Sequence, residues 1–317
     1  MINLPKLTDL DVSNKKVLLR LDLDTNPDPN DLRIKSSYET LDYLKGKASE
    51  IIILAHRGRP NGKIVDDLSL KSFQPIFDKW GATVYENLRF DDGEEKNDLE
   101  FAKKLASLGD VYINDAFASS HRNHASIVSL PKLLPYAVGF RFEKEVGNLS
   151  KVFNPVRPLV ILISGVKKDK VNMIEPLSNL ADKVLVGGRL PDFLGDNTVS
   201  VRSQNGKIIV GNLTMDKEDI TVNTIEKFKE EIKKAKTIVL AGVLGKYEDE
   251  GHSQGTKEIF TAVANSNSFK IVGGGDSLTA IERYNLTEKF DWISVGGGAM
   301  LDFLVKKTLP GIEALLH

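Results

Sequence analysis

Arginine and histidine side chains gather in three stretches of the first half of the chain. They are Arg33, His56 with Arg59, and Arg122 between His121 and His124. A guanidinium group binds two oxygens of a phosphate or carboxylate at once, so such clusters suit a small acid that carries phosphate. A solvated basic loop has the same residue types, but the second and third stretches closely follow apolar, strand-like runs. We therefore predict an anion-binding site.

Polar side chains also end the first apolar run. In Arg20-Leu-Asp-Leu-Asp24, the two-residue period of a strand places Arg20, Asp22 and Asp24 on one face. Ligands of open α/β sheets bind at such carboxyl ends. A polar strand end that meets only water is the alternative, so this segment indicates a site only together with the basic clusters.

Glycine runs mark three strand-to-helix junctions in the second half. They are Gly187-Gly188, Gly273-Gly274-Gly275 followed by Asp276, and Gly296-Gly297-Gly298. Bare N–H groups at the start of a helix, together with the helix dipole, suit the phosphates of a nucleotide. Asp276 can hold Mg²⁺ against those phosphates, whereas the third run suits helix packing nearly as well as ligand contact. A nicotinamide-dependent dehydrogenase is disfavoured, because no acidic partner follows the glycines at the required distance.

A lysine-rich turn follows the most apolar run, Leu159–Ile163. In Ser164-Gly-Val-Lys167-Lys-Asp-Lys170, two lysines three positions apart share a face if the helix has begun. With the backbone donors of the turn they can hold a phosphoryl group during transfer, although an exposed turn has the same composition. The turn lacks the G-x-x-x-x-G-K-[ST] pattern of a P-loop.

Apolar runs of strand length alternate with helical patterns along nearly the whole chain. The predicted strands are 17–21, 51–54, 111–113, 159–163, 184–186, 237–240, 270–272 and 292–295, and the predicted helices include 99–108, 142–153, 224–232 and 277–284. This alternation predicts an α/β protein whose mainly parallel sheets are covered on both faces. Asn205-Gly206 predicts a tight hairpin.

The chain length of 317 residues suits two domains, because single cores stop growing at about 250–300 residues. We expect the boundary where the predicted helix 142–153 meets Asn154-Pro-Val-Arg-Pro158, since proline disfavours continuation of a helix. The predicted lobes are 1–153, with the tail 308–317 as a candidate addition, and 154–307. A hinge is expected at 142–158.

Composition limits the function classes. The formal net charge is −1, so we expect neither nucleic acid nor a membrane as partner. The absence of cysteine excludes disulfides, thiolate catalysis and cysteine-bound zinc. The first residues lack a signal-peptide pattern, and the apolar run 159–166 is far shorter than the roughly 20 residues of a membrane span. We expect a cytoplasmic protein.

Taken in order, the motifs resemble those of the phosphoglycerate kinase family. Arg20-Leu-Asp-Leu-Asp24 is similar to the family's Arg-Val-Asp-Phe-Asn, and His56-Arg-Gly-Arg-Pro60 is similar to its His-Leu-Gly-Arg-Pro. Further matching blocks are Glu86–Phe90, Asn114–Phe117, His121–Ser126, Gly255–Lys257, Val272–Ser277, Gly296–Ala299 and Leu309–Ile312. The resemblance runs from the first predicted strand to the end of the chain.

The resemblance implies two Rossmann-like lobes, each of three α/β/α layers, in a monomeric enzyme. Its activity would be reversible, Mg²⁺-dependent phosphoryl transfer from 1,3-bisphosphoglycerate to ADP, giving 3-phosphoglycerate and ATP. By similarity, the phosphoglycerate site comprises Asp22, Asp24, Arg33, His56, Arg59, Arg122 and Arg157. The nucleotide site comprises Lys170, Glu248, Gly274, Gly275, Asp276 and Ser277, with Asp276 on the metal. Arg33 and Lys167 would be catalytic, because they stabilise the transferring phosphoryl group.

Departures from the family's pattern support an alternative. Asp24 replaces an asparagine, the turn at Lys167 is one residue shorter, and elements expected between Gly188 and Thr224 give way to the segment 196–215. These losses fall mainly in the predicted nucleotide lobe. The first hypothesis is a compact, working kinase. The second is a kinase-derived binding or regulatory protein that has lost nucleotide turnover.

Overall fold

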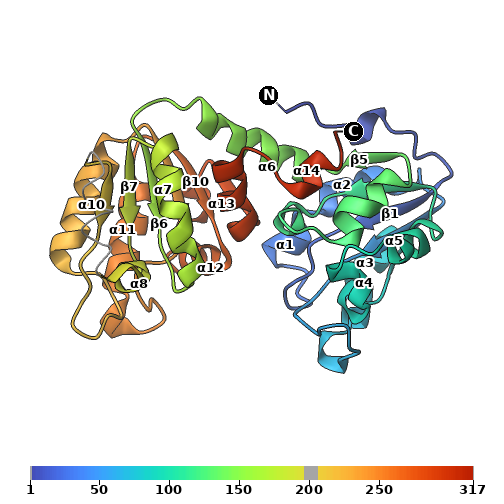
Figure 1. Cartoon of the computed structure of the whole chain (residues 1–317), viewed down its shortest axis with the longest axis horizontal. Helices are drawn as coiled ribbons and strands as arrows, with labels where there is room; N and C mark the ends of the chain where they lie inside the picture. The colour runs from blue at the N-terminus through green and yellow to red at the C-terminus, as the bar shows by residue number, and fades with distance from the viewer. Residues whose placement is uncertain (1, 196–205, 317) are drawn as a thin grey trace. The chain divides into compact units, whose positions relative to one another are not determined.

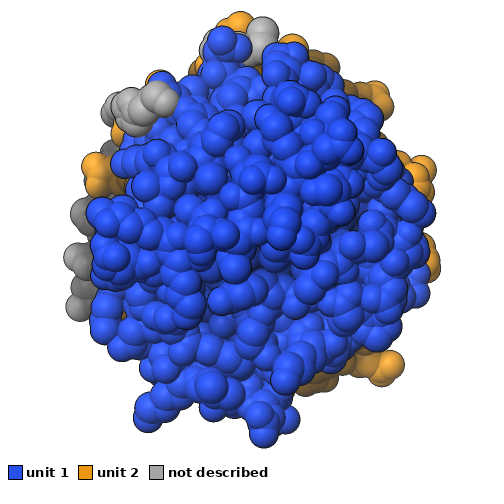
Figure 2. Space-filling model, turned by 90° about the vertical axis from the view of Figure 1, so that its right-hand side faces the viewer, with its two compact units in different colours: residues 1–147, 308–317 blue, residues 148–307 orange. Residues whose placement is uncertain are grey.

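The computed structural model describes residues 2–195 and 206–316. The chain forms two compact units, of which unit 1 comprises Met1–Gly147 and Thr308–His317 and unit 2 comprises Asn148–Lys307 (Figure 1). The division falls inside helix α6 (Phe140–Ser150), in the stretch where the sequence suggested a hinge. Figure 2 shows one face of unit 1 as a continuous, closely packed surface.

Unit 1 is built on a five-stranded parallel sheet with the order β3-β2-β1-β4-β5. Its strands are β1 (Lys16–Arg20), β2 (Glu50–Leu54), β3 (Ala82–Val84), β4 (Val111–Asn114) and β5 (Tyr136–Val138). The register pairs Arg20 with Leu54 on one side and with Asn114 on the other. The three central strands therefore end level, and the loops after them share one edge of the sheet.

Short helices pack around this sheet. They are α1 (Leu32–Lys35), α2 (Tyr38–Leu44), α3 (Gln74–Phe77), α4 (Asp92–Glu95), α5 (Leu99–Ala106) and α14 (Pro310–Glu313). Val17 and Leu19 of β1 belong to one core with side chains of α2 and α3. Leu18, which points to the opposite face, is also fully buried, so the sheet is covered on both sides.

Unit 2 is built on a six-stranded parallel sheet with the order β11-β10-β9-β6-β7-β8. Its strands are β6 (Leu159–Ile163), β7 (Lys183–Val186), β8 (Ile208–Val210), β9 (Thr237–Ala241), β10 (Phe269–Gly273) and β11 (Trp292–Ser294). Ala241 is level with Ile163 and with Gly273. The lysine turn and the glycine turns therefore follow strands that end at one edge.

Longer helices flank the second sheet. They are α7 (Val171–Leu180), α8 (Leu190–Leu194), α10 (Val222–Lys234), α11 (Gln254–Ala264), α12 (Gly275–Arg283) and α13 (Gly297–Lys306). The core on one face joins side chains of α10, α11 and α12 to Val160 and Leu162. Ile161, on the other face of β6, is fully buried too. Continuous apolar strands buried on both faces are typical of parallel α/β sheets.

The structure confirms the predicted α/β class and all eight predicted strands, within one residue at each end. It adds the three-residue strands β3, β5 and β8, which are too short to give a periodic signal. The four helices predicted by range are present. The helix expected at 142–153 is α6 followed by a 3₁₀ turn at Lys151–Phe153.

Part of the expected replacement segment, residues 196–205, and Asn205 of the expected hairpin lie outside the described residues. On the described side, β8 pairs in parallel with β7. A short loop at Thr214–Asp219 then leads to α10 and is closed by the bond from the Thr214 N–H to the Asp219 carbonyl oxygen, 2.9 Å long. None of the helices in residues 2–195 and 206–316 has the length and apolar character needed to cross a membrane.

Candidate functional site

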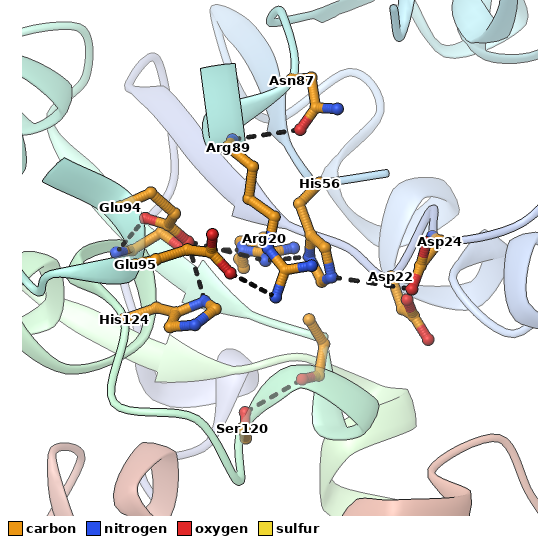
Figure 3. Close-up of polar contacts among 12 residues, drawn as sticks. Arg20, Asp22, Asp24, His56, Asn87, Arg89, Glu94, Glu95, Ser120 and His124 are labelled. Carbon is orange, nitrogen blue, oxygen red and sulfur yellow. Dashed lines mark hydrogen bonds and ion pairs between the residues drawn. The ribbon is translucent and has the colours of Figure 1, made fainter. Parts of the chain in front are cut away.

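The loops after β1, β2 and β4 bring the polar side chains of unit 1 together around Arg20 (Figure 3). Arg20 is fully buried. Its Nε donates to Ser126 Oγ at 2.9 Å, one NH2 group donates to His56 Nδ1 at 2.9 Å, and the other donates to the Leu21 carbonyl oxygen. Because each nitrogen of the guanidinium is bonded, Arg20 fixes its neighbours and has no donor group left without a partner.

His56 is a neutral hydrogen-bond donor. Arg20 can only donate, so His56 Nδ1 accepts and the proton lies on Nε2. Burial, and then the charges of Arg20 and Arg89, hold the pKa of His56 well below its ordinary value. Nε2 lies 3.9 Å from Asp24 Oδ2. At neutral pH this side chain therefore offers one N–H group and no charge.

Asp22, Asp24 and Arg33 lie beside His56. Asp24 Oδ1 accepts from the Gly58 N–H at 2.8 Å, and Arg33 donates to the Asp24 carbonyl oxygen at 2.7 Å. An asparagine oxygen would accept the same Gly58 bond, so Asp24 changes the charge of the site and not this contact. Arg33 is 3.7 Å from Asp22 Oδ2, which is buried and has no hydrogen-bond partner in the described part of the chain.

Arg89, Glu94 and Glu95 belong to the same group, although sequence patterns did not single them out. Arg89 is buried, donates to the Gly58 carbonyl oxygen at 2.6 Å and lies 3.2 Å from Glu95 Oε1. Glu94 is fully buried and accepts from the Ser126 hydroxyl at 2.6 Å. The available signal was the block Glu86–Phe90, which contains Arg89 and resembles the family's motif.

Arg122 and Arg59 are candidate ligand contacts at this edge. Burial, and then the charge of Arg122, lower the pKa of Arg89. Arg122 Nε is buried without a hydrogen-bond partner among the described residues. Arg59 is exposed directly after Gly58. An anionic ligand would relieve the repulsion among Arg20, Arg89 and Arg122 and satisfy the unused donor.

His124 completes the group on the side of Glu94. Burial, and then the charges of Arg89 and Arg20, lower the pKa of His124 to about 3, so its imidazole is neutral. Its Nδ1 lies 3.7 Å from Glu94 Oε1. His124 and His56 are thus both uncharged, and Arg20, Arg89 and Arg122 supply positive charge at this site.

In unit 2, the two lysines of the turn after β6 have different environments. Lys170 Nζ donates to the Ser164 carbonyl oxygen at 2.6 Å and lies 3.4 Å from that of Ala241. Burial lowers the pKa of Lys170 to about 8. Lys167 is exposed. Helix α7 begins only at Val171, so the lysines do not share a helix face as the spacing suggested.

The triple glycine after β10 opens α12 as predicted. Gly274 has a φ of 109°, which a side chain would strain, and Gly275 is the first helical residue. Asp276 is exposed in the first turn of α12. Ser277 is fully buried and its Oγ accepts from the Gly242 N–H at 2.9 Å. Its side chain therefore joins α12 to the turn after β9.

A pocket of about 280 Å³ opens at this edge of unit 2. Its lining includes two of the predicted nucleotide residues, Glu248 and Asp276, together with Val166, Gly188, Val243, Leu244 and Tyr247. Small-molecule sites are concave and combine apolar walls with polar groups that orient the ligand. Half of this lining is charged, and the rest is apolar or glycine. Arg189, Lys217 and Glu218, which follow β7 or lie in the loop before α10, also line the pocket and were not indicated by the sequence.

Arg157 does not join either group. It precedes β6, so it lies at the amino-terminal edge of the second sheet, opposite to the glycine turns. It donates to Asp182 Oδ1 at 2.8 Å and to the Leu180 carbonyl oxygen at 3.3 Å. Asp182 also accepts from the Leu159 N–H, at 2.7 Å. Its prediction as a phosphoglycerate ligand is corrected: Arg157 fastens the start of β6 to the start of β7.

Comparison with known proteins places the chain among phosphoglycerate kinases. The phosphoglycerate kinase family model matches residues 7–85, 78–205 and 192–307. A phosphoglycerate kinase of Finegoldia magna is 33% identical over 399 aligned positions, which cover 99% of each chain. Since this chain has 317 residues, the relative contains segments that it lacks. The last two matched segments meet at 192–205, where the sequence indicated lost elements.

Solved structures show the same relation. The phosphoglycerate kinase of Coxiella burnetii superimposes with a TM-score of 0.83 at 29% identity and covers 99% of both chains. That of Pyrococcus horikoshii superimposes with a TM-score of 0.83 at 26% identity and covers 98% of both. The similarity thus extends over both units and over nearly the whole length of each chain.

Proposed function

This chain belongs to the phosphoglycerate kinase family, and we propose that unit 1 binds the phosphoglycerate and unit 2 binds the nucleotide. The chain is a phosphotransferase with a carboxyl group as acceptor, acting in glycolysis. It transfers phosphate between 1,3-bisphosphoglycerate and ADP on one side and 3-phosphoglycerate and ATP on the other. The assignment of individual residues below is our proposal.

The arginine group of unit 1 carries the proposal for the acid site. Arg122, with its unused buried Nε, binds an anionic end of the substrate together with Arg59. His56 adds its Nε2–H group. Asp22 Oδ2, which is buried and has no hydrogen-bond partner in the described ranges, accepts from the substrate hydroxyl. Arg20 and Arg89 hold these groups in place.

The pocket of unit 2 supports the proposal for the nucleotide site. Gly274 and Gly275 offer backbone N–H groups at the start of α12, and Lys170 adds a positive charge beneath them. Among the described residues, no group of three or more acidic or histidine side chains is arranged to hold a metal by itself. The exposed carboxylate of Asp276 suits Mg²⁺, because this ion is commonly held by one or two carboxylates and by substrate phosphates. When bound, Mg²⁺ would neutralise phosphate charge.

Arg33 and Lys167 are the proposed catalytic residues. Arg33 is partly exposed beside Asp22 and Asp24, and Lys167 is exposed in the turn after β6. Phosphoryl transfer depends mainly on positioning and charge neutralisation, so both cations would stabilise the phosphoryl group between donor and acceptor oxygens. Transfer also requires both substrates in one reacting complex, and we propose that residues 142–158 act as the hinge that allows it.

A coupled assay with 3-phosphoglycerate, ATP and Mg²⁺ tests the reaction, and calorimetry with each substrate separately tests the assignment of the sites. Arg122→Gln should weaken 3-phosphoglycerate binding and leave MgADP binding unchanged. Asp276→Asn should weaken MgADP binding and leave 3-phosphoglycerate binding unchanged. Acid binding without turnover would instead favour a binding or regulatory role. We also propose a cytoplasmic monomer, which sedimentation and cell fractionation would test.

A further inference from the structure

The two ends of the unit 2 pocket are set by strand order. Asp276 follows β10 and Arg189 follows β7, and the sheet order places β9 and β6 between these strands. Three strand spacings separate β10 from β7, which corresponds to about 14 Å. This is the scale of an extended nucleoside triphosphate. If Asp276 marks the phosphate end, as the proposed function has it, Arg189 marks the end that receives the base.

Arg189 is held at that end by bonds to both its backbone and its side chain. Its N–H donates to the Gly165 carbonyl oxygen at 3.0 Å. Its guanidinium lies 3.2 Å from Asp192 Oδ2 and 3.4 Å from Glu218 Oε1. Its Nε is buried and has no hydrogen-bond partner within residues 2–195 and 206–316. The guanidinium is therefore oriented, with donor capacity left over.

Glu218 is presented by a loop that is fixed on three sides. The Glu218 carbonyl oxygen accepts from the Lys246 N–H at 2.9 Å. Asp216 Oδ2 lies 2.8 Å from His252 Nε2, and Asp219 Oδ2 accepts from the Gly255 N–H at 2.9 Å. Such a loop gives the pocket a preformed wall in which Lys217 and Glu218 lie beside Arg189. Preformed donors and acceptors contribute more to selectivity than mobile ones.

A phosphate does not suit this end of the pocket. Glu218 and Asp192 lie against Arg189, and Asp192 also pairs with Lys217, so a phosphate would have to displace carboxylates that these cations already hold. A base edge suits it, because a base presents donors beside acceptors. The apolar side chains of Val166, Val243 and Leu244 line the same pocket and can cover the faces of a planar ring.

We propose that Arg189 and Glu218 bind the edge of the purine base and set the base preference of the enzyme. Arg189 donates to a ring nitrogen or exocyclic oxygen, and Glu218 accepts from the amino group. Guanine offers one acceptor, O6, beside two donors, N1–H and the 2-amino group, whereas adenine offers one donor beside one acceptor. A carboxylate can accept twice from guanine, so GTP is used at least as well as ATP. The inference rests on the proposed nucleotide site.

The test compares nucleotides in the wild-type protein and in Glu218→Gln. The substrates are GTP, ATP and purine riboside triphosphate, whose base lacks exocyclic groups. In the wild-type protein, kcat/KM should be at least tenfold higher for GTP than for the riboside analogue, since a hydrogen bond to a charged group is worth roughly tenfold or more. In Glu218→Gln this ratio should fall about tenfold, and the KM for 3-phosphoglycerate should stay within about twofold.

Matched controls are Glu231→Gln, which removes an exposed α10 ion pair with Lys234, and Arg157→Gln, which removes the pair with Asp182. Both control variants should leave the ratio of kcat/KM for GTP to kcat/KM for the riboside analogue unchanged. Arg189→Gln should raise the KM for GTP and for ATP. An unchanged GTP-to-analogue ratio in Glu218→Gln would overturn the inference. If the wild-type protein turned over no nucleotide, the proposed reaction would be wrong. The ratio of the Kd for purine riboside triphosphate to the Kd for GTP, measured by calorimetry in both proteins, would then test whether Glu218 contacts the base.

Discussion

Unit 1 surrounds its candidate site with charged side chains that are buried and bonded to one another. Unit 2 lines its pocket with apolar side chains, glycine turns and charged side chains that are exposed or partly buried. Arg20 and Glu94 are fully buried, whereas Lys167 and Asp276 are exposed beside glycines. The first arrangement suits a small acid of fixed shape, because each donor has one position. The second suits phosphates, because backbone N–H groups at a helix start need no particular side chain.

This difference explains how the nucleotide unit tolerates a shorter chain. The turns that bear Gly188, Val243 and Asp276 follow β7, β9 and β10 and depend on the order of the sheet, to which the described part of the replacement segment contributes the edge strand β8. From the stretch between β8 and α10, Lys217 and Glu218 line the pocket. A side-chain network could not lose a comparable segment, since each buried charge depends on partners that are distant in sequence.

The largest expected effect is a loss of catalytic rate when one proposed catalytic residue of either unit is replaced. Arg33→Ala and Lys167→Ala should each lower kcat on the order of 10²–10³-fold, the usual cost of losing one preorganised charge stabiliser. The KM of the substrate bound by the other unit should change little. Lys35→Ala and Lys168→Ala, which remove neighbouring exposed lysines, serve as controls in the coupled assay. Near-normal kcat in both alanine variants of the catalytic residues would remove them from the transfer step.

The second expected effect is on folding and should appear in one unit alone. Arg20→Met removes the bonds to Ser126 and His56 and leaves buried polar groups unpaired, which costs about 3–5 kcal/mol. The chain has two tryptophans, Trp80 in unit 1 and Trp292 in unit 2, so Trp292→Phe and Trp80→Phe backgrounds report each unit separately during urea unfolding.

The matched variant in unit 2 is Ser277→Ala, which loses the single bond from the Gly242 N–H and should cost about 1 kcal/mol. Its effect should be seen through Trp292 and not through Trp80. If Arg20→Met shifted the unit 1 transition by no more than Ser277→Ala shifts that of unit 2, the contrast between a buried charge network and backbone turns would not hold.

The same contrast determines how much could be predicted from the sequence. Continuous apolar runs predicted the long strands, and the positions of His56 and Gly274 directly after them predicted where ligand groups lie. Glu94 could not be predicted, and Arg89 was marked only by the block Glu86–Phe90, because charged residues are seldom buried and their partners are distant. Ser126, for instance, is 106 positions from Arg20 and 32 from Glu94. The ligands assigned to these residues stay predictions.

Arg157 and Ser277 show a second limit of sequence reasoning. Ser277 lies in a block that resembles the family's, and Arg157 was assigned by the same resemblance, yet Arg157 pairs with Asp182 at the amino-terminal edge of the sheet. Ser277 turns its hydroxyl inward to the Gly242 N–H. A motif fixes where the backbone passes, whereas the direction of a side chain depends on neighbours from other strands.

A smaller effect is expected on nucleotide binding, which should depend on the charge of Lys170. Its pKa is lowered to about 8 by burial, so it loses its proton between pH 7 and pH 9, where an exposed lysine would stay charged. If the charge helps to hold nucleotide phosphates, the Kd of MgADP should rise about tenfold over this range. Lys170→Met should bind more weakly at pH 7 and show a flatter pH profile. An equally steep profile in Lys170→Met would assign the dependence to another group.

The smallest expected effect concerns His252, which holds the loop that carries Glu218. Hydrogen bonds to Asp249 and then Asp216 raise the pKa of His252. A raised pKa means that this contribution to stability is complete below the ordinary histidine value and is lost as pH rises through the raised value. His252→Gln should therefore lower the unfolding midpoint of unit 2 at pH 6 and hardly at pH 9, as reported by Trp292 at low salt. Asp216→Asn should remove most of the same pH dependence. Equal destabilisation by His252→Gln at both pH values would mean that the side chain acts through packing and not through its charge.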